Sequence, residues 1–382
     1  MRKKVIFTGG RSPFTLELAR FFYKFDYDVY IAETFIKNIT SFSKYTKKTL
    51  YVPPPAQKTE DFIDTLKEHI SVLKADLLIP TCEETFYVGM YKKELEKYCS
   101  VFTQDISILK RLHSKYKFIE LLQILDISFP KTKIFSDINL IKEEIKDQEF
   151  FIVKPEFSRF ATMTIINDKN KLNEINVSES YPWVVQEFID GDALCSYSIA
   201  KDGKVLGHAI YPSIYRAGQG ATIYFESVFD EQIDDIVTKI VKELNFTGQI
   251  SFDFIKSKKD GKVYPIECNP RTTSGTYLFA DEDNLPLAFE GNTDKIIRPS
   301  DKRNKTVILA MLVYALPKIR SLGELNKFIK DLVNAKDTVF RAEDIKPFLS
   351  QILTMWHYAK IGKKKDISFI EALTYDIEWN GN

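Results

Sequence analysis

The chain has 382 residues, 44% of them hydrophobic, with 54 Lys and Arg against 53 Asp and Glu. This length suits about two to four domains, and the hydrophobic content excludes a mainly disordered chain. The balanced charge gives no reason to expect nucleic acid or a membrane as a partner. The longest apolar run, Val307–Leu316, is well short of a membrane-spanning helix, which needs about 20 residues.

Cysteine and histidine usage disfavours two common kinds of small-domain scaffold. Four cysteines and four histidines are scattered along the chain, without a Cys-x-x-Cys pair or the spacing of a zinc site. Disulfide frameworks and structural zinc sites are therefore disfavoured. Free cysteines fit a reducing compartment, and the first residues lack the apolar stretch of a signal peptide. We expect a cytoplasmic protein.

The first hundred residues alternate between strand and helix patterns. Three apolar runs predict strands, at Val5–Thr8, Asp28–Ala32 and Asp76–Pro80. The first helix should begin at Pro13 with Ser12 as its cap, and Thr59 should cap a later helix. This alternation predicts a small parallel α/β domain, Rossmann-like in form, over residues 1–104.

The glycines after the first strand raise the alternative of a dinucleotide site. A nicotinamide-binding domain has Gly-x-Gly-x-x-Gly at this place, whereas this chain has Gly9-Gly10-Arg11. Glu33 ends the second strand, where such domains bind a ribose, but many strands end in an acid for no such reason. An N-terminal dehydrogenase domain is therefore the weaker alternative.

The middle of the chain, residues 105–300, mixes helix and strand patterns. A helix capped by Ser114 precedes strands at Phe150–Val153 and Trp183–Ile189. The stretch that follows alternates apolar and polar residues as antiparallel strands do, with one helix near Glu231–Leu244. We expect an α+β domain with two subdomains, 105–187 and 188–300.

The last part of the chain, residues 301–382, has mainly helical spacing. Helices are predicted at Leu322–Leu332, Phe348–Ile361 and Phe369–Leu373. We expect a helical C-terminal extension. Two roles stay open for it, a surface between two copies of the chain or a lid on a substrate pocket.

A predicted hairpin places three oxygen-bearing side chains together. The return strand, Val263–Asn269, puts Glu267 and Asn269 on one face. With a turn near Asp260, Asp253 should lie opposite Glu267. Oxygen ligands without His or Cys suit Mg²⁺, which usually shares its coordination shell with substrate phosphates. On spacing alone, a hairpin with a solvated polar face remains the alternative.

The residues around this hairpin favour the metal site. The segment Ile266-Glu267-Cys268-Asn269-Pro270-Arg271 resembles the Glu-x-Asn-Pro-Arg signature of the ATP-grasp superfamily, in which the acid and the amide hold magnesium over ATP. Asp253 matches the upstream acid that completes this pattern. The resemblance is to members of the carbamoyl-phosphate-synthase large-chain type, and it covers about Val5 to Arg271.

Further positions match the ATP-binding parts of that superfamily. Lys115 resembles its first ATP-binding lysine, and Lys154 resembles the second, which reaches the α- and β-phosphates. The segment Gln186-Glu187-Phe188-Ile189 is similar to the hinge that reads the adenine edge, and Asp192 stands near the position of a ribose-binding acid. The resemblance therefore implies nucleotide contacts at Lys115, Lys154, Glu187, Phe188, Ile189 and Asp192.

Two more features bear on the resemblance. The loop Glu156–Thr162 contains no glycine, whereas the superfamily usually covers the phosphates with a glycine-rich loop. Two interpretations stay open: the loop is stiffer than in the superfamily, or Ser158 and Arg159 bind phosphate in place of bare backbone. Residues 1–104 are similar to the domain that precedes the ATP-grasp domain in that superfamily.

The resemblance implies an ATP-dependent ligase. Such an enzyme activates a carboxylate as an acyl phosphate and couples it to an amine or a similar nucleophile, with release of ADP and phosphate. Mg²⁺, or alternatively Mn²⁺, would be held by Asp253, Glu267 and Asn269. Arg271 and Arg216 would act on the γ-phosphate or the substrate carboxylate, since both suit the fork of an arginine. The implied partners are ATP, a small carboxylate and an amine.

Other functions on the same scaffold stay open at this point. One is a nucleotide-binding sensor or scaffold without ligase activity, and others are a carboxylase or a kinase. The sequence does not name the carboxylate or the amine, because a fold leaves that choice to the shape of the pocket.

Overall fold

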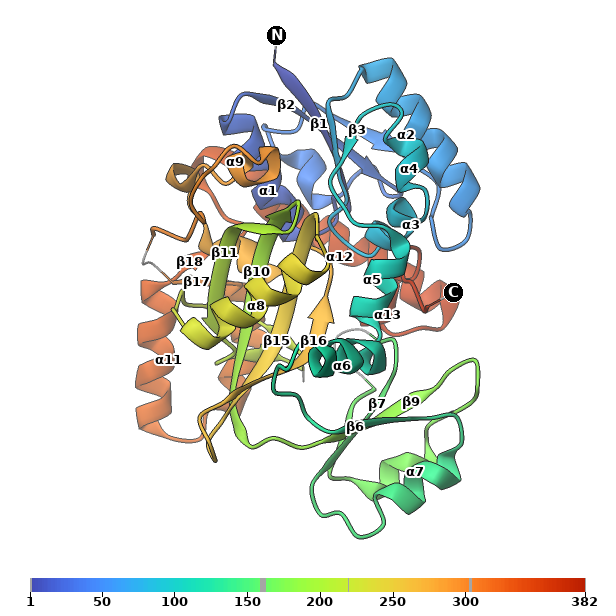
Figure 1. Ribbon diagram of the computed structural model, residues 1–382. Coiled ribbons are helices and arrows are strands. Elements are labelled where there is room, and N and C mark those ends of the chain that lie inside the picture. Colours follow the sequence, from blue (N-terminus) through green and yellow to red (C-terminus); the bar gives the residue numbers. More distant parts are fainter. Residues whose placement is uncertain (1, 159–162, 219, 302–303, 382) are drawn as a thin grey trace.

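The computed structural model describes residues 2–158, 163–218, 220–301 and 304–381 (Figure 1). An α/β domain formed by the N-terminal residues lies at the top of this view, a small sheet lies at the bottom, and a larger sheet lies between them. None of the described helices combines the length and the apolar character that crossing a membrane requires. The mixed α/β and α+β architecture predicted from the sequence is confirmed.

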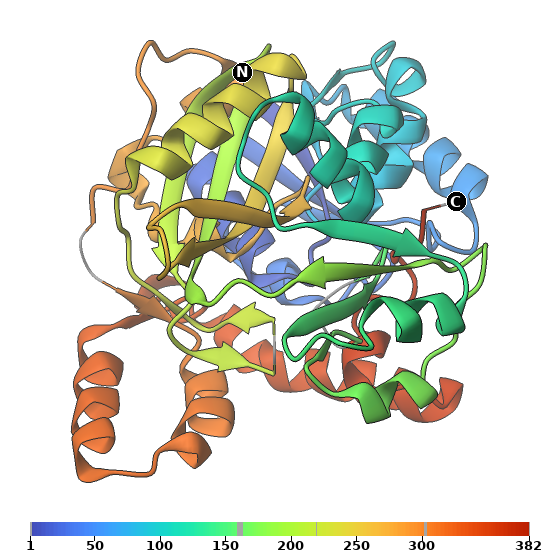
Figure 2. The ribbon, with the colours of Figure 1, turned by 60° about the horizontal axis from the view of Figure 1, so that its bottom comes forward.

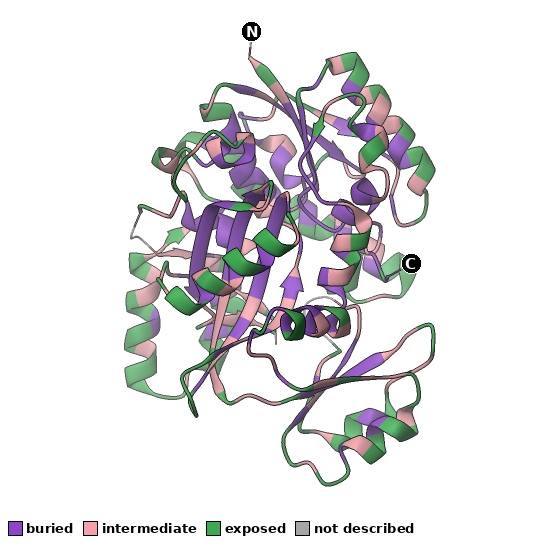
Figure 3. Ribbon diagram, in the orientation of Figure 1, coloured by how far each residue is buried: buried purple, intermediate pink, exposed green. Residues whose placement is uncertain are grey.

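The N-terminal domain is built on a parallel sheet with the strand order β3-β2-β1-β4-β5. Val5 and Phe7 of β1 pack with residues of α1, whereas Ile6 packs with residues of α2. The two helices therefore cover opposite faces, and Val5–Phe7 of β1 are all apolar because both faces of the strand are buried there (Figure 3). The strands are β1 (Lys3–Thr8), β2 (Tyr27–Glu33), β3 (Lys48–Tyr51), β4 (Leu77–Ile79) and β5 (Ser100–Val101); the helices are α1 (Pro13–Lys24), α2 (Thr59–Leu73), α3 (Glu84–Met90), α4 (Lys92–Leu95) and α5 (Ile106–His113).

The small sheet has the strand order β6-β9-β7-β8, and all its pairs are antiparallel. It has a hydrophobic core of its own, in which Trp183, Phe151 and Ile141 are almost fully buried. The predicted strand Trp183–Ile189 ends two residues early, so Phe188 and Ile189 leave the sheet. This part comprises α6 (Lys115–Ile124), β6 (Thr132–Phe135), α7 (Ile138–Glu144), β7 (Phe151–Pro155), β8 (Ile165–Ile166) and β9 (Trp183–Glu187).

The larger sheet has the strand order β11-β10-β15-β16 and is antiparallel. Helix α8 covers one face (Figure 1), and on the other face Ile199 shares a core with Phe7 and Phe22 of the N-terminal domain. The predicted register is confirmed, since Asp253 of β15 pairs with Glu267 of β16. The elements are β10 (Gly191–Lys201), β11 (Lys204–Pro212), α8 (Glu231–Glu243), β15 (Gly248–Ser257), β16 (Val263–Asn269) and α9 (Pro286–Glu290).

The C-terminal region is mainly helical, as predicted, but it also contributes short strands. β17 joins β14 and β18 in a three-stranded sheet, and β12 pairs with β13 in a small hairpin. Figure 2 shows the segment from Ile308 to Asn334 as a helical hairpin that projects from the rest of the molecule. The elements of the C-terminal region are β17 (Lys305–Thr306), α10 (Ile308–Ala310), a π-helical turn (Met311–Ala315), α11 (Leu322–Asn334), β18 (Lys336–Asp337), α12 (Lys346–Lys365) and α13 (Phe369–Ala372). The short strands β12 (Arg216–Ala217), β13 (Ala221–Thr222) and β14 (Tyr224–Phe225) belong to the middle of the chain.

Two predicted helix caps differ from the structure. Ser12 stands at the N-cap of α1, but its side chain makes no capping hydrogen bond and its Oγ lies 3.0 Å from Cys82 Sγ. Helix α2 begins at Thr59 itself, whose hydroxyl donates to the carbonyl oxygen of Pro55. In each case the hydroxyl contacts another partner and does not accept a hydrogen bond from the first turn of the helix.

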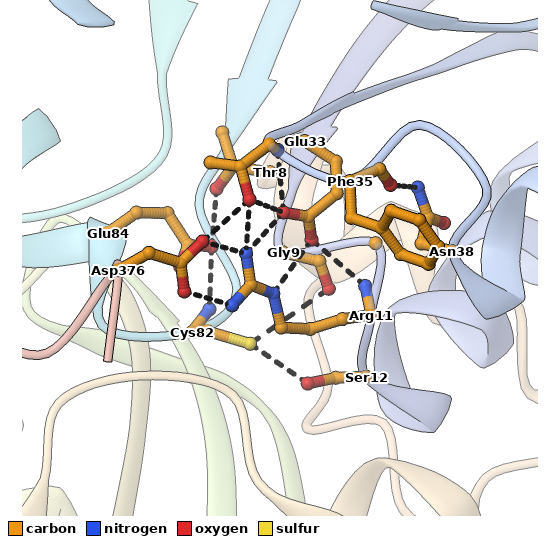
Figure 4. A network of polar contacts seen from close by, with 12 residues as sticks. Thr8, Gly9, Arg11, Ser12, Glu33, Phe35, Asn38, Cys82, Glu84 and Asp376 are labelled. Carbon is orange, nitrogen blue, oxygen red and sulfur yellow. Dashed lines mark hydrogen bonds and ion pairs between the residues drawn. The ribbon is translucent and has the colours of Figure 1, made fainter. Parts of the chain in front are cut away.

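A buried arginine ties the end of the chain to the N-terminal domain (Figure 4). The Arg11 guanidinium donates to both oxygens of Glu33 and to Asp376, and its Nη2 also donates to Thr34 Oγ1 at 2.8 Å. Glu33 is therefore held by the chain itself. A Cβ atom at Gly9 would lie 2.6 Å from Glu84 Oε1 and 2.6 Å from Thr81 Oγ1, so side chains pack directly against this loop. The dehydrogenase alternative is not supported.

This cluster predicts a large stability effect. Arg11→Ala would leave two buried carboxylates without their cation, and we expect it to lower the free energy of unfolding by about 3–5 kcal/mol. Lys58→Ala, which removes an exposed ion pair with Asp61, is the control and should cost about 0–1 kcal/mol. Urea unfolding measures both variants. Similar small losses in the two would contradict the role given to Arg11.

Candidate functional site

A cavity of about 360 Å³ lies between the small sheet and the larger sheet. Its walls come from β7 and β9 on one side and from β10, β15 and β16 on the other. Eight of the residues predicted from the sequence line it: Lys154, Glu187, Phe188, Ile189, Asp192, Arg216, Asp253 and Glu267. The structure therefore brings most of the predicted site to one place, although these residues are spread over more than a hundred positions of the chain.

Lys154 is a buried cation in the wall of this cavity. It lies near the end of β7, and its Nζ donates to Gln186 Oε1 at 3.0 Å and to the carbonyl oxygen of Ile266 at 3.4 Å. Burial lowers its pKa to about 8, against the opposing effect of Glu267 and Asp253 and with a further lowering by Lys115. The Lys154 ammonium group is shielded from water and has only neutral hydrogen-bond acceptors. An anion that enters the cavity would therefore bind strongly to it.

Lys115 lies close by but does not line the cavity. It is the first residue of α6, which Ser114 caps by accepting from the backbone N–H of Lys117 at 3.0 Å. A lysine in a first helical turn is usually exposed, whereas Lys115 is 2% exposed and its Nζ donates to the carbonyl oxygens of Glu156 and Ser158. It therefore holds the start of the loop that follows β7.

The predicted phosphate loop lies partly outside the described residues, at 159–162. Of the described part, Ser158 contributes its carbonyl oxygen to Lys115, and its hydroxyl is not part of the cavity wall. The Glu156 carboxylate accepts from the hydroxyl of Ser114, so this end of the loop is fastened to α6. The role predicted for the Ser158 side chain stays a prediction.

Two carboxylates face each other on neighbouring strands of the larger sheet. Asp253 and Glu267 form a register pair, and a β-bulge follows directly after Asp253. Burial and the charge of Glu267 raise the pKa of Asp253 to about 6. Cys195 of β10 pairs with Asp253 from the other side and also lines the cavity. Like charges held together at a half-buried position favour a bound cation between them.

Asn269 and Arg271 continue this row beyond the cavity wall. The Asn269 Oδ1 accepts from Arg271 Nη2 at 3.1 Å, and the Nε of Arg271 lies 3.9 Å from Glu83 Oε1 of the N-terminal domain. Among the described residues, no group of three or more His, Cys, Asp or Glu side chains is placed to hold a metal ion. Two carboxylates with one amide are an all-oxygen donor set, and this set fits Mg²⁺.

The hinge predicted at Gln186–Ile189 divides its residues between two tasks. Gln186 points to Lys154, whereas Glu187 pairs through its backbone and its carboxylate with Lys131, at 2.8 Å and 3.0 Å. Phe188 and Ile189 follow the end of β9 and line the cavity, as does Asp192 at the start of β10. The Gln186 side chain was not among the residues predicted for the site, although period-2 alternation along β9 places it on the opposite face from Glu187.

Comparison with known proteins identifies the domain that carries this cavity. Residues 112–275 match the family model described as the ATP-grasp domain. The chain is 24% identical over 288 residues to D-aspartate ligase of Enterococcus faecium, an alignment that covers 66% of this chain and 68% of the relative. It is 25% identical over 213 residues to the carbamoyl phosphate synthase large chain, C-terminal section, of Methanopyrus kandleri, which covers 51% of this chain but 39% of that protein.

Solved structures share the fold at low sequence identity. The N5-carboxyaminoimidazole synthetase of Staphylococcus aureus complexed with ADP superposes with a TM-score of 0.64 at 13% identity, covering 85% of this chain and 86% of that one. An L-amino acid ligase from Bacillus licheniformis gives a TM-score of 0.60 at 16% identity, with 81% and 80% covered. These structures show a shared fold, and the match of residues 112–275 to the family model confirms the resemblance to the ATP-grasp superfamily that was drawn from residue motifs.

Lys154 predicts a pH-dependent affinity for ATP. The pKa of its ammonium group is about 8 in the free protein, and a triphosphate beside it would raise that value. Affinity should therefore be constant below about pH 8 and weaken above it, by up to about tenfold per pH unit, because only the complex keeps the proton. Isothermal titration calorimetry on both sides of pH 8 measures this. Lys154→Arg, which stays charged, should flatten the profile; equal slopes would contradict the assignment.

Proposed function

We propose that this chain, which carries an ATP-grasp domain, is an ATP-dependent ligase that activates a carboxylate as an acyl phosphate and couples it to an amine. The observation that carries the proposal is the meeting of a buried lysine, Lys154, with the carboxylate pair Asp253 and Glu267 in one cavity. The cavity then has a cation for the phosphates on one wall and oxygen ligands for a metal on the opposite wall. The names of D-aspartate ligase and L-amino acid ligase support the reaction class.

The nucleotide would lie between the two sheets. Phe188 and Ile189 are free of strand pairing and would offer backbone groups and apolar surface to the adenine, while Asp192 would face the ribose. The Lys154 ammonium group would bind the α- and β-phosphates. Lys115 would act on the phosphates through the loop that it holds, which includes the Ser158 backbone.

Asp253, Glu267 and Asn269 would hold Mg²⁺, with Mn²⁺ as the alternative ion. When bound, the ion supplies positive charge that neutralises the triphosphate and the developing charge of the transfer. Asp253 contributes a second effect by itself, since its raised pKa couples the binding of a cation to the release of a proton.

The arginines would position the carboxylate that attacks. Arg271 is anchored by Asn269 and approaches Glu83, so its fork is held at the edge of the site. Arg216 lines the cavity from the side of β12. A carboxylate oxygen would attack the γ-phosphorus, the bond from that phosphorus to the bridging oxygen would break, and ADP would leave. An amine would then attack the acyl carbon and displace phosphate, so the reaction needs no protein nucleophile.

We also propose the domain boundaries 1–104, 105–300 with a division after 187, and 301–382. The substrates are a small carboxylate and an amine, the location is the cytoplasm, and self-association is left open. The alternative function is that of a nucleotide-binding protein without ligase activity. The ligase would release ADP in a manner that depends on substrate, and the alternative would not.

The nucleotide product tests the reaction class. Lys154 would place positive charge on the α- and β-phosphates, and the metal site would place it at the far end of the triphosphate. This distribution of charge favours attack at the γ-phosphorus. We expect ADP and phosphate, and we expect hydroxylamine in place of the amine to trap the acyl phosphate as a hydroxamate. Chromatography of the spent nucleotide decides between the outcomes. Stoichiometric AMP with pyrophosphate would refute the acyl-phosphate mechanism even though the fold is as described.

Glu267 provides a test of the metal assignment. Glu267→Gln removes one anionic ligand and keeps the size of the side chain, so we expect turnover to fall at least about a hundredfold with a higher Mg²⁺ requirement. Because it also relieves the repulsion with Asp253, the variant should be as stable as the parent or more stable. Glu243→Gln, at an exposed position of α8 that does not line the cavity, is the matched control. Unchanged Mg²⁺ dependence in Glu267→Gln would overturn the ligand assignment.

A further inference from the structure

A second hollow adjoins the nucleotide cavity. This groove, of about 610 Å³, shares Arg216 and Ile166 with the cavity wall, so the two spaces meet at the Arg216 side chain. Its remaining walls come from the segment before β12 and from the helical hairpin of the C-terminal region: Ile214, Tyr215, Ala315, Ile319 and Phe328. The hairpin lies beyond residues 112–275, so one wall of the groove comes from outside the matched domain.

The walls of the groove are apolar and held in place. The Tyr215 ring packs edge-on against Phe328 and Tyr224, with centroids 6.2 Å and 5.6 Å apart. Its hydroxyl donates to Asp331 Oδ2 at 2.9 Å, so the polar end of the residue is already engaged and the ring serves as a wall. Phe328 belongs to a small core that also includes Ile223 and Tyr224. The groove is thus preformed, and its volume falls within the range of ligand pockets.

The charged groups at the groove favour an anion. Arg216 donates through Nε to Ser213 Oγ at 2.8 Å, and no carboxylate of the described residues forms an ion pair with it. Lys318 and Lys327 also line the groove. The single acid there, Glu324, accepts from the backbone N–H of Arg320 at the start of α11. An arginine fork without a carboxylate partner, next to an apolar wall, is suited to a carboxylic acid with an apolar body.

We infer that this groove holds the apolar part of the carboxylic acid that the enzyme activates, with the carboxylate on Arg216. The inference rests on the ligase function proposed above and specifies its substrate class, a monocarboxylic acid with an aliphatic or aromatic chain. The carboxylate would stand where the groove and the cavity meet, in the cavity that Asp253 also lines. Apolar contacts along Ile214 and Tyr215 would supply the affinity, and Arg216 would aim the attacking oxygen at the nucleotide.

A series of acids tests this substrate class. Acetate, butyrate, hexanoate and 3-phenylpropionate are supplied with MgATP and hydroxylamine, and hydroxamate formation gives kcat/KM for each. If the chain is buried in the groove, kcat/KM rises by about fourfold for each added methylene until the groove is filled. A flat series with measurable hydroxamate would overturn the inference and leave the ligase function standing.

Two matched variants locate the effect. Ile214 lines the groove and is 43% exposed, whereas Ile329 of α11 is 49% exposed and does not line it. Neither side chain is part of a core, so both Ile→Asn variants should fold normally. We expect Ile214→Asn to lower kcat/KM for hexanoate at least about fivefold while changing acetate less than about twofold. Ile329→Asn should change neither, and equal effects of the two variants would contradict the inference.

Direct binding separates this inference from the proposed reaction. Ligand-observed NMR gives the Kd of 3-phenylpropionate for the full chain and for both variants, without turnover. Binding that weakens in Ile214→Asn but not in Ile329→Asn supports the groove, even when no ADP is released, in which case the ligase proposal fails alone. Binding that is absent or indifferent to Ile214 overturns the groove, even when ADP is released with small acids.

Discussion

The pair of carboxylates at Asp253 and Glu267 is the constraint on which the site depends. They face each other across two paired strands, and burial together with their mutual repulsion raises the pKa of Asp253 to about 6. The same cavity lowers the pKa of Lys154 to about 8. Such shifts oppose folding, and groups perturbed in opposite directions within one cavity are typical of functional sites. The rigid β-strands hold these groups in positions that free side chains in solution would not adopt.

The rest of the molecule holds the two sheets and the N-terminal domain around this cavity. Glu83 of the N-terminal domain approaches Arg271 on the larger sheet, and its other oxygen accepts from the backbone N–H of Trp379. The Trp379 ring also packs edge-on against Phe157, in the loop that follows β7. Together with the Arg11 cluster, these contacts connect residues 376–379 to the N-terminal domain, to the loop that follows β7 and, through Glu83, to the larger sheet. The C-terminal region therefore takes part in placing the site, in addition to forming the wall of the groove.

Features that depend on local patterns could be predicted from the sequence. The alternation over β15 and β16 fixed the register of Asp253 with Glu267, because a hairpin with a short turn allows few registers. The motif around Glu267 and the two lysines pointed to the ATP-grasp domain. The burial of Lys115 could not be predicted, since the acceptors that hold it, the carbonyl oxygens of Glu156 and Ser158, lie about forty residues away in the chain.

Other features had no local signal. Strands of two residues, such as β17 and β18, are too short for any periodicity and exist through their pairing alone. The hydroxyls of Ser12 and Thr59 have the right type for caps, but tertiary and turn partners compete for them. The apolar groove joins residues near 214 with residues near 328, so the sequence could propose Arg216 as a carboxylate partner without showing the surface beside it.

The central claim is that a carboxylate oxygen attacks the γ-phosphorus of ATP inside this cavity. Transfer of ¹⁸O from a labelled carboxylate to the released phosphate tests it most directly, because the oxygen that bridges carbon and phosphorus in the acyl phosphate leaves with the phosphate. The account predicts that ³¹P NMR shows one ¹⁸O atom in each phosphate formed during coupling to an amine. Phosphate that carries no label, formed alongside the amide product, would contradict it.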